Sequence, residues 1–212
     1  MQQFRDINTF RCIISLIVFV CTALLTITGE AEQQGPSDVI RKFNSCLTKS
    51  MKEAEKFGYS GRYKILEPVI KDSFALSYMA PISVGRYWKN LNEKERCLFL
   101  ETYTNWTIAT YAGRFNDYSG EKFEVTSESK PERGIVTVIS KLIQPQKEDI
   151  EFYYKLRKLE DKWQIVDIQI SGVSQLALTR SQFVSVIKNK GFDELISTLR
   201  NKIKDFSQGE NQ

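Results

Sequence analysis

The side chains that most often perform acid–base or metal chemistry are scarce in this sequence. None of its 212 residues is a histidine, which excludes imidazole as a base, as the partner of a nucleophile or as a metal ligand. An enzyme would therefore depend on carboxylates, tyrosines, lysines or a serine–lysine pair. Asp167 is the carboxylate of interest, because it lies between Val166 and Ile168 in an apolar strand pattern. Strand alternation, however, predicts that Asp167 faces outward as a solvated or ion-paired side chain.

Other nucleophiles and ligands give weaker signals. Ser174 follows Gly172 but lacks the second glycine of a nucleophile elbow and any partner base. The glycines stand apart, so no phosphate-binding loop is found. Beyond the N-terminal segment only Cys46 and Cys97 remain, either as small buried residues on helices or, in an oxidising compartment, as a disulfide. Two thiols are too few for a metal site, and we expect neither a metal nor a cofactor.

The first residues have the composition of a secretory signal. Two arginines precede an uncharged, mostly apolar run over residues 12–27, and small residues follow it, as in a cleaved signal peptide. The run is shorter than the roughly 20 residues that usually span a bilayer. We predict a signal peptide over 1–31 cleaved after Ala31, a domain over 32–206 and a polar tail over 207–212. An uncleaved membrane anchor is the alternative, and either way the domain lies outside the cytoplasm.

The spacing of apolar residues predicts the elements of this domain. Asn92 and Glu95 resemble a capping box that begins a long helix, and from residue 121 the apolar period changes from 3.6 to 2. That change predicts four antiparallel strands with short links, ending near residue 170. Helices are expected over 37–56, from Pro68, over 82–89, over 92–115, from the Thr179–Gln182 capping box to a stop at Gly191, and over 193–206.

Helices that precede and follow a block of strands indicate an α+β fold, with a curved antiparallel sheet and helices on one face. The net charge is +4 and no block of like charges occurs, so a nucleic-acid surface has little support.

Large aromatic residues are plentiful for a domain in which no set of catalytic residues is found. Most are expected to pack in the core, and a ligand cavity is the alternative.

The C-terminal half carries a family resemblance. Residues 163–206 resemble the MlaC-type periplasmic lipid-binding proteins, also called the toluene-tolerance auxiliary component family, and residues 111–121 resemble that family's long helix and first strand. The matching residues are Trp163, Asp167, Gly172-Val173-Ser174, Arg180, Gln182-Phe183, Gly191 and the helix over 195–199. Segments 60–63, 83–88 and 174–177 are most similar to the HpnM branch, which is associated with hopanoid biosynthesis.

The resemblance implies an NTF2-like α+β fold, in which a twisted four-stranded sheet and helices enclose an apolar pocket. It also implies a monomeric periplasmic carrier of phospholipid or hopanoid, with no enzymatic activity. Such a carrier exchanges lipid with an inner-membrane lipid transporter complex and an outer-membrane lipoprotein or porin complex. We expect the pocket to be lined by Phe74, Trp106, Val136, Val138, Phe152, Tyr154, Val166, Ile168, Ile170 and Val173, with Arg180 near the lipid head group.

The sequence leaves two alternative functions open. The NTF2-like fold also hosts lyases and isomerases, so an enzyme that uses Asp167 and a tyrosine is one alternative. A cell-envelope adaptor whose interior is filled by its own side chains is the other.

Overall fold

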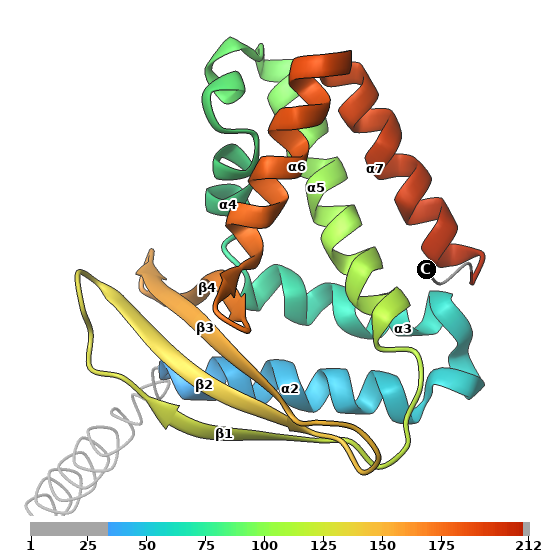
Figure 1. Cartoon of the computed structure of the whole chain (residues 1–212), viewed down its shortest axis with the longest axis vertical. Coiled ribbons are helices and arrows are strands. Elements are labelled where there is room, and N and C mark those ends of the chain that lie inside the picture. Colours follow the sequence, from blue (N-terminus) through green and yellow to red (C-terminus); the bar gives the residue numbers. More distant parts are fainter. Residues whose placement is uncertain (1–33, 210–212) are drawn as a thin grey trace, which may run out of the picture. The chain divides into compact units, whose positions relative to one another are not determined.

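The computed structural model describes residues 34–209, so the predicted signal segment and its cleavage site lie outside the described residues. Helices gather on one side of an antiparallel sheet, which confirms the α+β class (Figure 1). No helix in the described range is long and apolar enough to span a membrane. The elements are α2 (Pro36–Lys52), α3 (Ala54–Ser73), α4 (Leu76–Val84), the 3₁₀ helix η1 (Gly85–Asn90), α5 (Glu93–Arg114), β1 (Lys122–Glu128), β2 (Ile135–Ile143), β3 (Ile150–Leu159), β4 (Lys162–Ile170), β5 (Val173–Ser174), α6 (Gln175–Lys190) and α7 (Phe192–Ser207).

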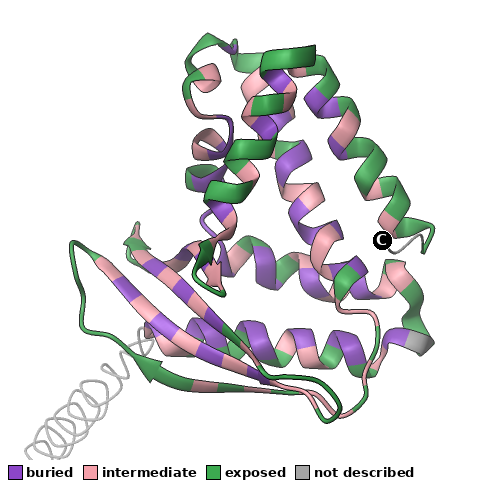
Figure 2. Cartoon of the chain, viewed as in Figure 1, coloured by how far each residue is buried: buried purple, intermediate pink, exposed green. Residues whose placement is uncertain are grey.

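The sheet is a meander with the order β1-β2-β3-β4-β5, and every neighbouring pair is antiparallel. Four strands were expected from the sequence, and the short β5 adds a fifth by pairing with the end of β4. Buried and partly exposed residues alternate along β2 and β3 (Figure 2). That alternation is the signature of a sheet with one face covered by helices.

A bulge in β4 makes the predicted alternation wrong at one point. Ile165 lies opposite Leu156, and Asp167 lies opposite Lys155, so Val166 is an extra residue without a partner on β3. Ile165 and Val166 are therefore both buried, instead of one facing inward and the other outward. An inserted residue shifts the side-chain phase of a strand by one, which is how β4 buries consecutive apolar residues.

Helix boundaries differ from the sequence prediction where long-range contacts set them. The chain breaks at Gly58, as expected, with φ of 57°, but the helix resumes at once and carries Pro68 in its interior instead of in its first turn. α4 begins at Leu76 instead of at Ile82. The predicted capping box of α5 is confirmed: the Asn92 N–H donates to Glu95 Oε2 at 2.7 Å, and the Glu95 N–H donates to Asn92 Oδ1 at 3.0 Å.

α6 begins earlier than its Thr179–Gln182 pattern predicts. The Ser174 hydroxyl accepts a hydrogen bond from the Ala177 N–H at 3.0 Å, and Asp167 Oδ1 accepts one from the Leu176 N–H at 3.0 Å. Two N–H groups of the first turn are thereby satisfied, and a carboxylate at this end is also favoured by the helix dipole. Ser174 and Asp167 together fix the start of α6 on the sheet edge.

Specific polar contacts hold the helices against the sheet. Asn44 of α2 donates to the Ser140 hydroxyl of β2 at 2.8 Å in an otherwise apolar contact. The junction between α3 and α4 is tied to β4, because the Ala75 N–H donates to the Ile165 carbonyl at 3.0 Å. α7 packs on α5 at Gly113, where an added Cβ would lie 2.2 Å from the Phe206 ring, so only glycine fits there.

Candidate functional site

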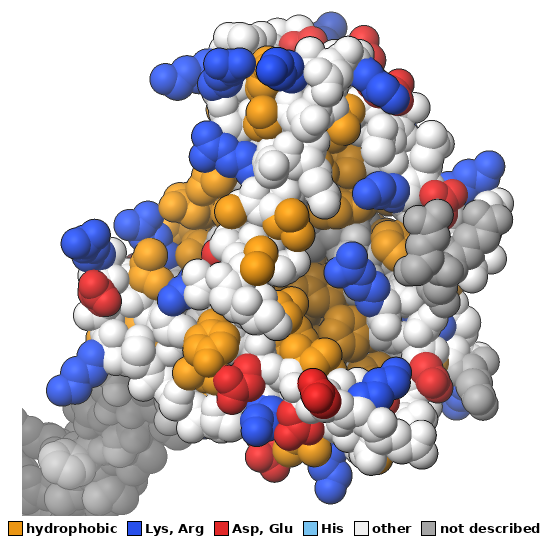
Figure 3. Space-filling view, viewed as in Figure 1, with side chains coloured by type: hydrophobic (Ala, Val, Ile, Leu, Met, Phe, Trp, Pro, Cys, Tyr) orange, Lys and Arg blue, Asp and Glu red, His pale blue; other side chains and the backbone are white. Residues whose placement is uncertain are grey.

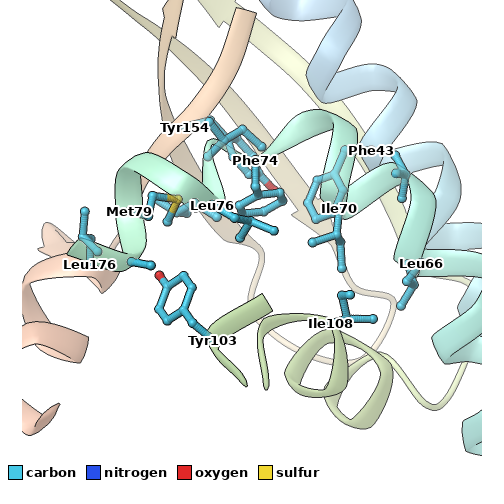
Figure 4. Packing of buried hydrophobic residues seen from close by; sticks show 14 of the residues in the cluster. Phe43, Leu66, Ile70, Phe74, Leu76, Met79, Tyr103, Ile108, Tyr154 and Leu176 are labelled. Carbon is cyan, nitrogen blue, oxygen red and sulfur yellow. The ribbon is translucent and has the colours of Figure 1, made fainter. Parts of the chain in front are cut away.

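The inner face of the sheet and the surrounding helices form a continuous apolar interior. From the predicted site, Val136, Val138, Phe152, Tyr154 and Ile168 are buried on this face and belong to one hydrophobic cluster. Figure 4 shows part of that cluster, including Tyr154. The structure therefore places these five together, as the strand pattern predicts.

The remaining predicted strand residues differ in position. Val166 is buried in the β4 bulge. Ile170 lies opposite Phe152, so it shares the inner face, and it is half-buried. Val173 lies on β5 instead of on a helix and is 50 % exposed, which places it at the surface in this structure.

The predicted site residues outside the strands, Phe74, Trp106 and Arg180, lie at different depths in the domain. Phe74 directly follows α3 and is buried. Trp106 of α5 is half-buried, with its ring centroid 5.3 Å from that of Phe183. Arg180 is exposed on α6, and its guanidinium lies against Gly85, where a Cβ would be 3.0 Å from Nε. Gly85 has φ of 56°, so its backbone conformation and this close approach both favour glycine. Among residues 34–209 no ion pair involves Arg180, and its guanidinium charge remains available.

Six aromatic rings from α2, β1, β3, α5 and the residue after α5 form a closed series of contacts, which we call the aromatic circuit. Successive centroids are 5.3 to 6.3 Å apart, within the range of favourable aromatic pairs. The circuit runs through Tyr111, Phe115, Phe123, Phe152, Tyr154 and Phe43 and returns to Tyr111. It joins helices and strands that are distant in sequence around the middle of the domain.

One side of the aromatic circuit is open. Phe43 and Tyr154 are buried, whereas Tyr111, Phe115 and Phe123 are only partly buried although they pack on the core. Figure 3 shows hydrophobic side chains gathered at the floor of a recess, between the sheet below and α6 and α7 above. Apolar surface is therefore accessible inside this part of the domain instead of being sealed completely.

Three tyrosine hydroxyls of the interior have no hydrogen-bond partner among the described residues. Burial raises the pKa of Tyr103, Tyr111 and Tyr154 above its ordinary value, and the Tyr111 phenol adds to the rise in the other two. A further contribution to the Tyr103 pKa comes from the charge of Asp167. Each hydroxyl is therefore a neutral group that can donate a hydrogen bond.

These hydroxyls differ from that of Tyr59. The Tyr59 hydroxyl is sealed in the core without a partner, and burial raises its pKa to about 12. The hydroxyls of Tyr103, Tyr111 and Tyr154 also make no hydrogen bond within the described residues, but they are not fully sealed as the Tyr59 hydroxyl is. A small part of the surface of each of these three hydroxyls is therefore accessible. Figure 4 shows the Tyr103 hydroxyl directed toward Met79 and Leu176.

Alkaline pH should destabilise the fold through these tyrosines. Their folded-state pKa values lie above the ordinary value near 10, so the unfolded chain loses protons first as the pH rises. The stability that the neutral phenols contribute is complete below about pH 10 and is lost above it. We expect the buried tyrosines among the nine of the chain to ionise only together with unfolding, in a titration followed by tyrosinate absorbance and circular dichroism. Ionisation of all nine near pH 10 with the fold intact would contradict this assignment.

The polar groups considered as catalytic have structural roles or lie apart. Asp167 caps α6, as described above, which leaves its proximity to Tyr103 as the remaining basis for an acid–base pair. Cys46 is a half-buried free thiol, and Cys97 is an exposed free thiol, so the structure does not join them. Within residues 34–209 no group of three or more acidic or sulfur ligands is placed to hold a metal ion.

Sequence reasoning missed several members of the aromatic circuit as site residues. Phe43 lies in the helix expected over 37–56, and Phe123 lies at the start of the first expected strand, so the sequence pattern predicts ordinary core positions for both. Their apolar periodicity gave the correct inward face, but no local signal distinguishes a ring that borders open space from one that packs tightly. Tyr111 and Phe115 carried a signal, since they lie in the segment 92–115 and are among the plentiful aromatic residues for which a ligand cavity is the alternative to core packing.

Comparison with known proteins assigns the family. A profile described as "MlaC protein" matches residues 39–201. The chain belongs to the MlaC family. This confirms the resemblance derived from the sequence, whereas the assignment to the hopanoid-associated branch stays a prediction.

Individual MlaC relatives are distant in sequence but extend over most of the chain. The intermembrane phospholipid transport system binding protein MlaC of Haemophilus influenzae is 23 % identical over 194 residues, which cover 88 % of this chain and 90 % of that protein. A phospholipid-binding protein of Ralstonia solanacearum, solved in complex with a phospholipid, superimposes with a TM-score of 0.69 at 18 % identity. The superposition covers 84 % of this chain and 99 % of the other, so the two share a fold.

Proposed function

We propose that this MlaC-family protein is a periplasmic carrier that encloses the acyl tails of a phospholipid and moves the lipid between membranes. The observation that carries the proposal is the aromatic circuit with accessible apolar surface on its open side. Support comes also from the Haemophilus relative, which is named as a phospholipid transport protein, and from the Ralstonia protein, whose structure contains a phospholipid.

The physical need for enclosure is large. A diacyl lipid exposes on the order of 30 methylenes, and each costs about 0.8 kcal/mol in water, so free transit across an aqueous gap is strongly disfavoured. Inner-face residues such as Val138, Phe152 and Ile170 supply an apolar surface for the tails. The exposed, unpaired guanidinium of Arg180 is our candidate for contact with the phosphate of the head group, since arginine binds phosphate oxygens through two donors.

The partners that exchange lipid with the protein belong to the same proposal. The donor and the acceptor would be an inner-membrane lipid transporter complex and an outer-membrane lipoprotein or porin complex, between which the monomer shuttles. No covalent step is needed, so the absence of histidine from the sequence is no obstacle to this function.

Native mass spectrometry of the purified protein, followed by lipid extraction, tests the proposal. We expect one phospholipid per protein molecule. A co-purifying hopanoid would identify a carrier with another cargo and overturn the phospholipid assignment. Failure to bind phospholipid, either during purification or after incubation with vesicles, would favour the adaptor. Turnover of a small polar substrate that requires Asp167 would favour the enzyme.

A further inference from the structure

Within the interior, two unpartnered hydroxyls lie on the aromatic circuit itself. Tyr111 of α5 and Tyr154 of β3 flank the same ring, with centroids 5.3 and 6.3 Å from that of Phe43. Burial raises the pKa of Tyr154, and the Tyr111 phenol adds to the rise. Tyr154 is 2 % exposed, so its hydroxyl is almost completely shielded from bulk water.

Such hydroxyls are unusual in an apolar interior. A buried hydroxyl without a partner is unfavourable, and native proteins normally supply one. Phenylalanine would fill nearly the same volume without that penalty, and the circuit uses phenylalanine at its four other positions. Two donors among otherwise apolar walls are therefore the arrangement expected of a ligand pocket in which a few polar groups fix the orientation of the ligand.

The chemistry of the hydroxyls limits what they can recognise. Their raised pKa values keep them neutral, so each hydroxyl retains a proton that it can donate to a neutral or anionic acceptor. Within an acyl lipid, the acceptors that enter an apolar pocket are the ester carbonyls at the root of each chain. A diester lipid carries two such carbonyls, whereas a triterpene hydrocarbon carries none and a diether lipid has only weakly accepting ether oxygens.

We infer that the hydroxyls of Tyr111 and Tyr154 donate hydrogen bonds to the ester carbonyls of the bound lipid, and so select diester lipids over lipids without carbonyls. This inference rests on the proposed function. It adds a recognition element inside the pocket, where the apolar walls alone would accept any hydrocarbon of suitable size.

Binding to a matched pair of lipids tests the inference. The probes are a diester phosphatidylglycerol and its diether analogue with the same head group and chain length, each bound to lipid-free protein. Since one hydrogen bond contributes about 1 kcal/mol, we expect a preference of about 5-fold to 30-fold for the diester. The double variant Tyr111→Phe/Tyr154→Phe should bind both lipids with equal affinity.

Tyr153→Phe is the matched control. Tyr153 is the neighbour of Tyr154 on β3, but its hydroxyl donates to Glu151 at 3.0 Å and lies on the opposite face of the strand. This variant should keep the preference for the diester. In the double variant, the lipid-free protein should also be at least as stable to urea as the unmodified chain, since the substitutions remove only unpaired hydroxyls.

The possible outcomes separate the two proposals. Equal binding of diester and diether by the unmodified protein would overturn the hydrogen-bond inference and leave the carrier function standing. A preference that survives in the double variant would also overturn it, because the selection would then come from other groups. Failure to bind either lipid would overturn the carrier function itself.

Discussion

Replacement of Ile170 by aspartate should reduce co-purifying lipid at least tenfold while the protein remains folded. Ile170 lies opposite Phe152 on the inner face of the sheet and is half-buried, at the end of β4. A carboxylate at this position would have to lose its hydration when an acyl chain enters, and desolvation of an unpaired charge is far more costly than loss of one methylene contact. Because the side chain is partly accessible, the lipid-free variant can keep the carboxylate hydrated, and we expect a stability loss of only about 1–3 kcal/mol.

Gln169→Asp provides the matched control. It introduces the same charge one residue earlier, at a position that is also half-buried. Gln169 pairs with Tyr153 of β3, and both residues lie on the outer face of the sheet. Mass spectrometry of extracted lipid should find normal occupancy for this control and very low occupancy for Ile170→Asp. Equal occupancy in the two folded variants would show that the inner end of β4 does not contact the lipid. Val166 is a poorer test position, since it is buried in the bulge and an aspartate there would unfold the sheet.

The strands and the start of α5 could be predicted because local chemistry determines them. Period-two alternation along β2 and β3 gives the buried face directly, since residues two apart in a strand share a side. The Asn92–Glu95 capping box is likewise formed by residues three apart, and the structure contains both of its hydrogen bonds. In these segments the sequence pattern and the tertiary contacts favour the same conformation.

The β4 bulge and the start of α6 depend on neighbours that the local pattern does not reveal. Ile165 and Val166 are consecutive apolar residues, and only pairing with β3 decides which of them is left without a partner. Ser174 and Thr179 are both suitable helix caps, and the Asp167 carboxylate, which binds the Leu176 N–H, favours the earlier start. A prediction from one sequence has no access to either of these long-range contacts.

In the candidate site, too, some features follow from the local sequence pattern and others depend on long-range contacts. Apolar periodicity correctly placed Val138 and Tyr154 on one face, but the aromatic circuit joins α2, α5, β1 and β3. Its closure depends on how the helices cross the sheet, and that geometry is set by contacts such as the Asn44–Ser140 hydrogen bond. Whether rings that meet in this way enclose space or fill it is decided by distances of about an ångström, which residue types alone do not specify.

Truncation of Phe43 to alanine should give the largest loss of stability among single changes in the aromatic circuit, about 3–5 kcal/mol. Phe43 is 0 % exposed and contacts the rings of Phe74, Tyr111 and Tyr154. Its removal therefore combines the lost burial of a phenyl group with a cavity that its neighbours can only partly fill. Urea unfolding followed by circular dichroism measures the loss, and Phe57→Ala, at a position that is 42 % exposed, should cost less than about 1 kcal/mol.

The same variant also reports on where the acyl chains lie. If the chains run inside the aromatic circuit, bound lipid can occupy part of the space left by Phe43, and the variant should recover part of its lost stability when loaded with phospholipid. Recovery would then exceed the stabilisation that the same lipid concentration gives the unmodified chain, because ligand stabilisation increases with affinity for the folded state. Equal stabilisation of the two proteins would place the chains away from Phe43, on the side of the interior lined by Trp106 and Phe183. The comparison needs only urea unfolding with and without lipid, and it distinguishes the two halves of the interior by a difference in stability.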